Sequence, residues 1–242
     1  MMQRVVQVAM AAAMLGSAMV GSATRAEAQL PTVQQIYDKY ATAVGGRDAW
    51  AKVAGRTEKG TADITFAGLS GSYLRYIGAP NRMRMTIDLG VVQIDQGYDG
   101  EKGWAQQGQG AQRMPADQEK SMADNMQTGS AFLDPSRFSK AEVQGKETFD
   151  GVEAYKVAIT TKGGIEQVEF FDVATGLRIG TVATTPAGPQ RVTYRDYKDF
   201  EGKKLSTKVV QNTAQGDVII NIASVTFGAP DAAVFRAPVD LK

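Results

Sequence analysis

The sequence predicts an α+β fold in which a long meander of antiparallel strands is partly covered by a few short helices. Two observations predict it. Apolar and polar residues alternate in most segments after residue 70, as they do in strands with one buried face. An aromatic–acid–Gly string separates such segments three times, as Tyr98-Asp99-Gly100, Phe149-Asp150-Gly151 and Phe200-Glu201-Gly202. Asp-Gly between alternating segments is typical of a hairpin turn, so neighbouring strands should pair antiparallel.

The first 28 residues have the pattern of a secretory signal peptide. Arg4 supplies a positive charge, Val5 to Val20 form an apolar stretch, and Ala26-Glu27-Ala28 fits an A-x-A cleavage site. A membrane anchor is the alternative, although glycines and serines interrupt the apolar stretch. We therefore expect residues 1–28 to be removed and residues 29–242 to form a single soluble domain in the periplasm.

Charge and composition exclude several functions. Residues 29–242 hold 25 basic and 25 acidic side chains, and a chain of zero net charge lacks the basic surface that nucleic acids need. The chain has no histidine and no cysteine, which excludes Ser-His-Asp and Cys-His catalysis and ordinary zinc sites. We therefore expect no cofactor, no metal and no nucleic-acid partner. A pair of carboxylates is the remaining catalytic option, and no pair stands out in the sequence.

Two short helices are predicted before the strands. Thr32 and Gln35 fit a capping box. Apolar residues follow at helical spacing until Gly45-Gly46, which ends the first helix. The second helix is expected from Asp48 to Ala54.

The first predicted strands alternate clearly. Tyr73 to Ile77 leads to a turn at Ala79-Pro80-Asn81, and a second strand follows. Val92 and Ile94 continue the pattern, and Gly103-Trp104 begins a return strand. The second strand places Met83, Met85, Ile87 and Leu89 on one face and Arg82, Arg84, Thr86 and Asp88 on the other.

A third helix is expected to interrupt the strands from Ala116 to Gln127, and it carries Met122 and Met126. Strands then resume, which gives about 11 strands in total. The seven later strands are expected at Phe138–Gln144, Val152–Thr161, Ile165–Asp172, Leu177–Thr185, Gln190–Asp199, Lys203–Asn212 and Asp217–Phe227.

The apolar faces of these strands predict a binding surface. Together they would form a wide curved surface that three short helices cannot cover completely. Methionine is flexible and polarisable, and it is common on surfaces that accept varied apolar ligands. We therefore expect a lipid-binding cavity lined by Met83, Met85, Ile87, Leu89, Ile94, Trp104, Met122, Met126, Val192, Tyr194, Val209, Ile220 and Ile222.

Several strings also resemble one family of periplasmic proteins. They are Gly45-Gly46-Arg47-Asp48-Ala49-Trp50, Gly97-Tyr98-Asp99-Gly100 with Gly103-Trp104, Phe171-Asp172 with Thr175-Gly176-Leu177, Asp196-Tyr197 with Phe200-Glu201-Gly202, and Phe235-Arg236-Ala237-Pro238. Together they resemble the outer-membrane lipoprotein-sorting proteins related to LolA and LolB. The resemblance implies a strongly curved antiparallel sheet, an unclosed β-barrel, with lid helices over an apolar cavity for acyl chains. It also implies an arginine that controls the lid, for which Arg47 and Arg75 are both candidates.

The expected function is that of a non-enzymatic periplasmic carrier for a lipid or for the acyl chains of a lipoprotein. Its partners would be that cargo and a membrane-bound donor or acceptor protein. Two alternatives stay open at this point. One is a module of the same fold that senses the state of the cell envelope by binding a protein, and the other is a carboxylate-dependent hydrolase.

Overall fold

One antiparallel sheet of 13 strands organises the part of the protein that the structure describes. The structure is a computed structural model, and it describes residues 29–107, 110–125, 127–185 and 188–238. The expected signal peptide lies outside these residues. The strands are β1 (Gly55–Ile64), β2 (Leu69–Gly78), β3 (Arg82–Asp88), β4 (Gln93–Tyr98), β5 (Gly103–Gln107), β6 (Ala111–Arg113), β7 (Phe138–Phe149), β8 (Val152–Thr161), β9 (Glu166–Asp172), β10 (Arg178–Thr185), β11 (Gly188–Phe200), β12 (Lys203–Thr213) and β13 (Gly216–Phe227).

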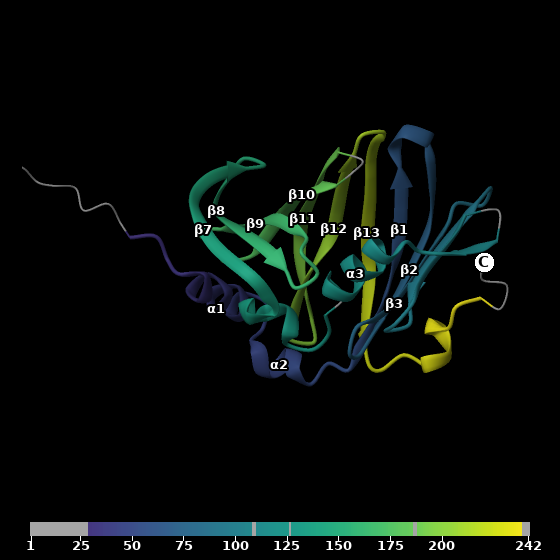
Figure 1. Cartoon of the computed structure of the whole chain (residues 1–242), viewed down its shortest axis with the longest axis horizontal. Helices are drawn as coiled ribbons and strands as arrows, with labels where there is room; N and C mark the ends of the chain where they lie inside the picture. The colour runs from purple at the N-terminus through teal and green to yellow at the C-terminus, as the bar shows by residue number, and fades with distance from the viewer. Residues whose placement is uncertain (1–28, 108–109, 126, 186–187, 239–242) are drawn as a thin grey trace, which may run out of the picture.

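The sheet is open, and its centre joins the two ends of the chain. Its strand order is β6-β5-β4-β3-β2-β1-β13-β12-β11-β10-β9-β8-β7, so β1 pairs with both β2 and β13. Strands β6 and β7 form the two edges and do not pair with each other in the described part of the chain. The sheet curves strongly along this order and leaves a concave face (Figure 1). The α+β half-barrel expected from the sequence is therefore confirmed.

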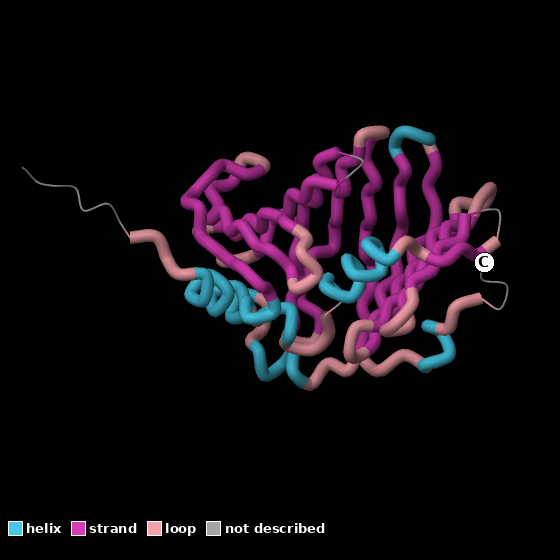
Figure 2. Tube along the Cα trace, in the orientation of Figure 1, coloured by secondary structure: helices cyan, strands magenta, loops and turns pink. Residues whose placement is uncertain are grey.

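Among the described residues, three helices and four short 3₁₀ turns accompany the sheet (Figure 2). They are α1 (Val33–Ala43), α2 (Arg47–Ala51), α3 (Ala116–Asn125), η1 (Thr65–Ala67), η2 (Ala131–Leu133), η3 (Pro135–Arg137) and η4 (Ala232–Phe235). None of the helices in the described part of the chain has the length and apolar character that a membrane-spanning helix needs.

Helix α1 begins and ends as the sequence predicts. The Thr32 side chain accepts a hydrogen bond from the Gln35 backbone, and the Gln35 side chain accepts one from the Thr32 backbone. Gly45 ends the helix with a φ of 110°. A Cβ atom at this position would lie 2.1 Å from the Gly202 carbonyl oxygen, so only glycine fits there. This close approach seats the α1–α2 corner on the turn between β11 and β12.

The helices at the N-terminus cover one end of the concave face. Ile36, Tyr37 and Tyr40 of α1 and Trp50 of α2 are buried in a cluster with strands β7 to β9. Tyr37 packs against Phe171, with ring centroids 5.2 Å apart. The predicted apolar stripe of the first helix is therefore the face that anchors it to the sheet.

Helix α3 crosses the concave face and links two distant parts of the sheet. Glu119 accepts a hydrogen bond of 2.9 Å from the Gly103 backbone in β5. Asp124 accepts one of 2.8 Å from the Gly163 backbone, in the turn between β8 and β9. The helix was expected to run to Gln127, and it ends at Asn125. Because β5 and β8 lie near opposite edges, α3 spans the mouth of the half-barrel.

The aromatic–acid–Gly strings form turns, as expected. Asp150 and Gly151 have φ values of 55° and 82°, and Glu201 and Gly202 have values of 53° and 75°. Positive φ at both central residues is the type I′ geometry of two-residue hairpins. The first copy differs, because Asp99 begins a four-residue turn in which its carboxylate accepts the backbone N–H groups at 101 and 102.

Strand positions agree closely with the predicted alternation, and two strands were missed. Each of the seven later strands lies at its predicted place, with ends shifted by at most a few residues except in β7, which extends five residues further. Strand β1 was not predicted, because its inward side chains include Arg56 and Glu58 rather than apolar residues alone. Strand β6 has only three residues, too few for a pattern to be recognised.

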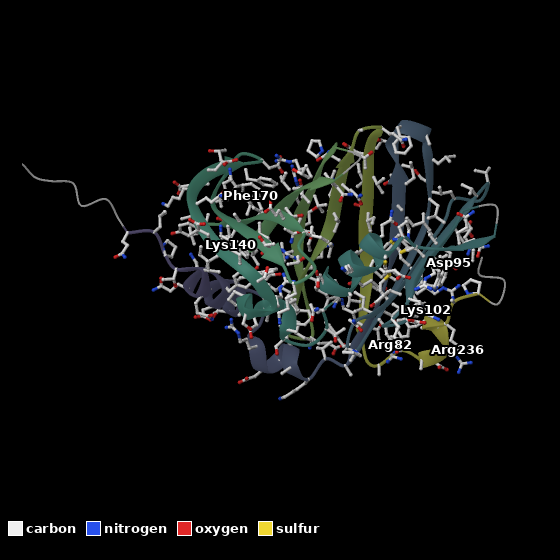
Figure 3. The ribbon with its side chains drawn as sticks, viewed as in Figure 1. Arg82, Asp95, Lys102, Lys140, Phe170 and Arg236 are labelled. Carbon is white, nitrogen blue, oxygen red and sulfur yellow. The ribbon has the colours of Figure 1, made fainter. Side chains whose placement is uncertain are left out.

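The C-terminal segment packs on the outer face of the sheet. The Phe235 ring lies beneath the Arg82 guanidinium, 4.9 Å from it. Arg84 donates a hydrogen bond of 3.3 Å to the Val234 carbonyl. Figure 3 shows Arg82 and Arg236 close together where this segment meets β3.

Candidate functional site

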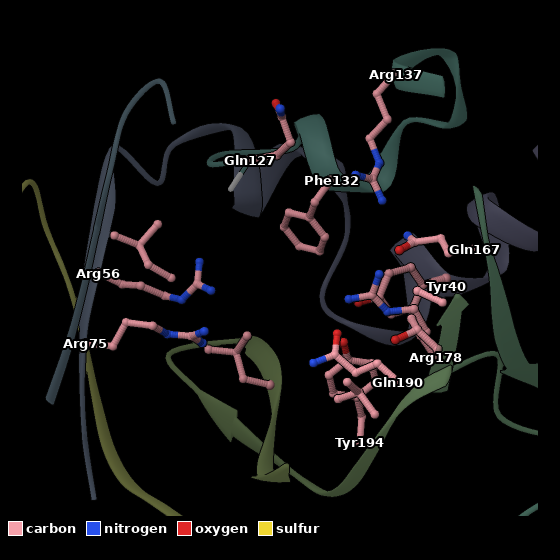
Figure 4. A pocket seen from close by; sticks show the side chains of 15 residues that line it. Tyr40, Arg56, Arg75, Gln127, Phe132, Arg137, Gln167, Arg178, Gln190 and Tyr194 are labelled. Atoms are coloured by element: carbon pink, nitrogen blue, oxygen red, sulfur yellow. The ribbon is translucent and has the colours of Figure 1, made fainter. Parts of the chain in front are cut away.

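A cavity on the concave face of the described residues has a volume of about 320 Å³. Strands β1 and β2 form one wall, and β9 to β12 form the opposite wall (Figure 4). Helix α1, the turns η2 and η3 and Gln127 close it. The lining residues are Tyr40, Arg56, Arg75, Ile77, Gln127, Phe132, Arg137, Gln167, Arg178, Thr181, Ala183, Gln190, Val192, Tyr194 and Leu205.

Two arginines of the first wall share one buried carboxylate. Glu58 is 1% exposed, and its two oxygens lie 2.7 Å from Arg56 Nε and 2.6 Å from Arg75 Nη2. Burial acts to raise the pKa of the Glu58 carboxyl, but the charges of Arg75 and Arg56 outweigh it, so the pKa lies below its ordinary value. The carboxylate stays ionised and holds both guanidinium groups in place.

The opposite wall repeats this arrangement around Glu169. This carboxylate is fully buried and lies 2.9 Å from Arg178 Nη1 and 3.5 Å from Arg137 Nη2. The Tyr37 hydroxyl donates a short hydrogen bond to it. Burial, and then the negative charge of Glu169, hold the pKa of the Tyr37 hydroxyl well above its ordinary value, so this hydroxyl remains a donor.

Aromatic rings support the Arg178 guanidinium. It lies 4.9 Å from the Tyr194 ring and 5.9 Å from the Tyr40 ring. The Tyr197 hydroxyl donates a hydrogen bond of 2.7 Å to the Arg178 carbonyl. Stacking on aromatic faces is a favoured environment for a partly dehydrated arginine. These contacts keep the Arg178 head group at the cavity wall.

An apolar strip continues from the arginine-lined cavity along the concave face. Tyr73 and Ile87 are directly paired across β2 and β3, and Ile87 pairs with Ile94 of β4. Arg75 lies two residues from Tyr73 on the same strand and pairs with Met85. Burial raises the pKa of the Tyr73 hydroxyl to about 12. The strip contains Ala62, Ile64, Leu69, Tyr73, Met85, Ile87, Leu89, Val92, Ile94, Val218, Ile220, Ile222 and Val225.

The predicted lining residues are distributed over the cavity and the strip. Val192 and Tyr194 line the cavity itself. Val209 pairs with Tyr194 and with Ile220, so it lies between the two regions. Met83 is buried in β3, Met122 is half-buried on α3, and Met126 lies outside the described residues. The strip contains Met85, Ile87, Leu89, Ile94, Ile220 and Ile222.

Trp104 was expected on the concave face and lies on the outer face instead. It pairs with Gly97, which pairs with Arg84. Arg84 alternates with the inward-facing Met83 and Met85, and its guanidinium lies 5.4 Å from the Trp104 ring. Strand β5 contains one large apolar side chain, so its sequence does not indicate which face that side chain occupies.

The charged residues of the cavity were missed in the sequence, apart from Arg75. The alternation of side chains along the strands could have indicated some of them. Arg75 alternates in step with Tyr73 and Ile77, and Glu169 alternates in step with Phe171. A charged residue in phase with buried apolar neighbours therefore points into the concave face.

The fold of this chain, a curved open sheet with helices on its concave face, is similar to that of at least three solved structures. A DUF1329 family protein from Desulfovibrio piger has a TM-score of 0.59 at 14% identity, and the match covers 84% of this chain and 99% of that one. A LolA superfamily protein from Nitrosomonas europaea has a TM-score of 0.57 at 11% identity, with 86% and 99% covered.

The third structure is a putative outer membrane lipoprotein-sorting protein domain from Vibrio parahaemolyticus. Its TM-score is 0.54 at 12% identity, and the match covers 82% of this chain and 94% of that one. No protein-family model matches the sequence, and no curated protein is similar enough in sequence to match. The resemblance predicted from the sequence is thus confirmed at the level of the fold.

Proposed function

We propose that this chain is a periplasmic carrier or binding protein for a lipid or for the acyl chains of a lipoprotein. The observation that carries the proposal is the continuity between the cavity and the apolar strip. The cavity volume lies at the lower end of the roughly 300–1,000 Å³ typical of ligand pockets. A longer chain would extend from the cavity over Tyr73 and Ile87 into the strip.

The strip is suited to an acyl chain because several of its side chains are only partly buried. Met85, Ile94 and Ile220 are half-exposed on the concave face, while Ile87 and Ile222 beneath them are buried. Each methylene that such a surface shields from water contributes about 0.8 kcal/mol. A long acyl chain would therefore bind without any covalent step, which favours a carrier over a hydrolase.

Helix α3 would control access to this site. It crosses the concave face and is held at both ends by single carboxylates, Glu119 and Asp124. Few contacts must break for it to move. In this proposal a membrane-bound donor or acceptor protein would displace α3 when the cargo is transferred. The predicted signal peptide places this exchange in the periplasm.

Binding of a fluorescent fatty acid tests the proposal. The protein without its first 28 residues should enhance the emission of 11-(dansylamino)undecanoic acid, and unlabelled palmitic acid should displace the probe. Ile94→Lys would place a charge in the half-exposed part of the strip, and it should abolish the enhancement. Thr226→Lys, on the outward-facing side of β13, is the matched control and should bind normally. No enhancement with the unmodified protein would contradict the proposal.

A further inference from the structure

We propose that the cargo carries an acidic group, a phosphate or a carboxylate, which binds between the arginines of the two cavity walls. This inference rests on the proposed lipid-binding function and specifies the ligand of the same site. The apolar tail would then follow the strip that begins beside Arg75. The site would therefore recognise an amphiphile by its charged end as well as by its chain.

The charge balance of the cavity favours an acidic ligand. Arg56, Arg75, Arg137 and Arg178 all line it. Within the described residues, Glu58 and Glu169 are the carboxylates that pair with them. None of the described lining residues is itself Asp or Glu, and the other polar positions include three neutral glutamines. Two positive charges are thus left without a counter-charge in a partly dehydrated site, which is costly unless an anion binds there.

Two arginine donors on one wall lack hydrogen-bond partners in the part of the chain that the structure describes. Arg137 Nε and Arg178 Nε are both buried and have no hydrogen-bond partner among the described residues. The positive charge of Arg137 is the less compensated of the two, because its nearest carboxylate oxygen, that of Glu169, is 3.5 Å away. The Arg137 side chain is 13% exposed, so water reaches it poorly. Buried donors are normally satisfied, and an acidic ligand would supply the missing acceptors.

The geometry of the two walls also favours an anion. Figure 4 shows Arg56 and Arg75 on one side of the cavity and Arg178 on the other, with Arg137 reaching in from the turn above. The planar guanidinium presents a fork of donors that matches both carboxylate and phosphate oxygens. An anion in the middle could contact donors from both walls, which a neutral head group could not use equally well.

The arrangement differs from a purely structural ion-pair network. In a structural network the charges balance and every donor is satisfied. Both oxygens of Glu58 are paired at 2.6 to 2.8 Å, but this one carboxylate faces two arginines. On the Arg137 side of the cavity the charges do not balance either, and the Nε donors of Arg137 and Arg178 have no partner among the described residues. Loss of the Arg137 charge should therefore not weaken the free protein, but it should weaken binding of an acidic ligand.

Matched pairs of probes test the inference. 11-(Dansylamino)undecanoic acid and its methyl ester differ only in the charge of the head group, and lysophosphatidic acid and monoacylglycerol of equal chain length give the same comparison for phosphate. We expect the acidic member of each pair to bind at least about tenfold more tightly, as lost hydrogen bonds to a charged group imply. Equal binding of acid and ester would overturn the inference and leave the proposed lipid binding intact. Binding of neither would contradict the proposed function itself.

Two variants assign the effect to the cavity. Arg137→Gln should lower the affinity for the acids about tenfold, leave the affinity for the esters unchanged, and leave the thermal unfolding midpoint unchanged or raised. Arg84→Gln removes an arginine that pairs with Asp95 on the outer face, and it should change neither affinity. An Arg137→Gln protein that binds acids normally would overturn the inference. Inorganic phosphate alone should displace the acidic probes only weakly, and displacement at micromolar phosphate would instead make the free anion the ligand.

Discussion

Arg75 and Glu58 lie opposite each other on neighbouring strands, and two nitrogens of the Arg75 guanidinium contact one carboxylate oxygen of Glu58 on the concave face. The Cα atoms are paired in the register of β1 and β2. Arg75 Nη2 lies 2.6 Å and Nε 2.8 Å from the same carboxylate oxygen of Glu58, while Arg56 Nε binds the other oxygen. Strands β1 and β2 therefore form one wall of the cavity although their sequence is polar. They can do so because their charged side chains pair with one another.

Replacement of Glu58 tests how much this pairing stabilises the fold. Glu58→Gln would leave two arginines beside a neutral amide, and we expect it to lower the free energy of unfolding by about 3 kcal/mol. Urea denaturation measures this change. The matched control is Glu142→Gln, since Glu142 forms an exposed pair with Lys140 at 3.7 Å and should change stability by less than about 1 kcal/mol. Equal effects of the two variants would show that the buried pair has no special role.

The same carboxylate predicts a pH dependence of stability. The pKa of Glu58 is lower in the folded chain than in the unfolded chain, where it is about 4.3. The ionised carboxylate therefore stabilises the fold fully above that value, and the stabilisation is lost as the pH falls through the lower folded-state pKa. Thermal unfolding of the unmodified protein and of Glu58→Gln should differ most near pH 7 and converge in strong acid. A constant difference between the two proteins at every pH would contradict this assignment.

Loss of the Tyr37 hydroxyl should destabilise the second wall. Tyr37→Phe keeps the ring packing against Phe171 but removes a donor to the buried Glu169. We expect a loss of about 1.5–3 kcal/mol in the free energy of unfolding, the range for hydrogen bonds to charged groups. Tyr155→Phe is the control, because Tyr155 lies on the same side of the core without a hydroxyl contact to a charged residue in the described structure. A Tyr37→Phe protein as stable as the control would show that Glu169 is satisfied by its arginines alone.

Release of the end of α3 should speed ligand exchange. Asp124→Ala removes the acceptor that ties the helix to the Gly163 backbone. We expect a dissociation rate of the dansyl fatty acid several times higher than in the unmodified protein, with little change in thermal stability. Stopped-flow displacement by unlabelled palmitic acid measures this rate. Glu101→Ala, in the turn before β5, serves as the control. An unchanged rate would mean that α3 does not limit access to the concave face.

Much of the fold could be predicted from the sequence, because half-buried strands alternate and hairpin turns have a strong signature. Strands β8 to β13 and the capping box of α1 follow these local rules. Local rules did not reveal β1, because its inward Glu58 pairs with Arg75 of the neighbouring strand as well as with Arg56 of its own strand. The alternation of β3 showed correctly that Met83 and Met85 share one face, but the single tryptophan of β5 gave no such information.

The candidate site was harder to predict than the fold. Its two walls meet only when β1 and β2 curve toward β9 to β12, and a linear pattern contains no information on that curvature. Val192 and Tyr194 were found because they belong to an apolar face. Arg137 and Arg178 were missed because their roles depend on Glu169, which is distant in the sequence from Arg137 and is recognisable as buried only in three dimensions.

Native mass spectrometry of the protein purified from its own cells tests the central claim most directly. The account predicts a population of protein that carries one bound amphiphile, whose released mass corresponds to a lipid or acylated molecule with an acidic group. It further predicts that this population disappears in the Ile94→Lys variant and persists in Thr226→Lys. Protein that is free of any bound lipid, and that takes up no fatty acid when one is added, would contradict the account.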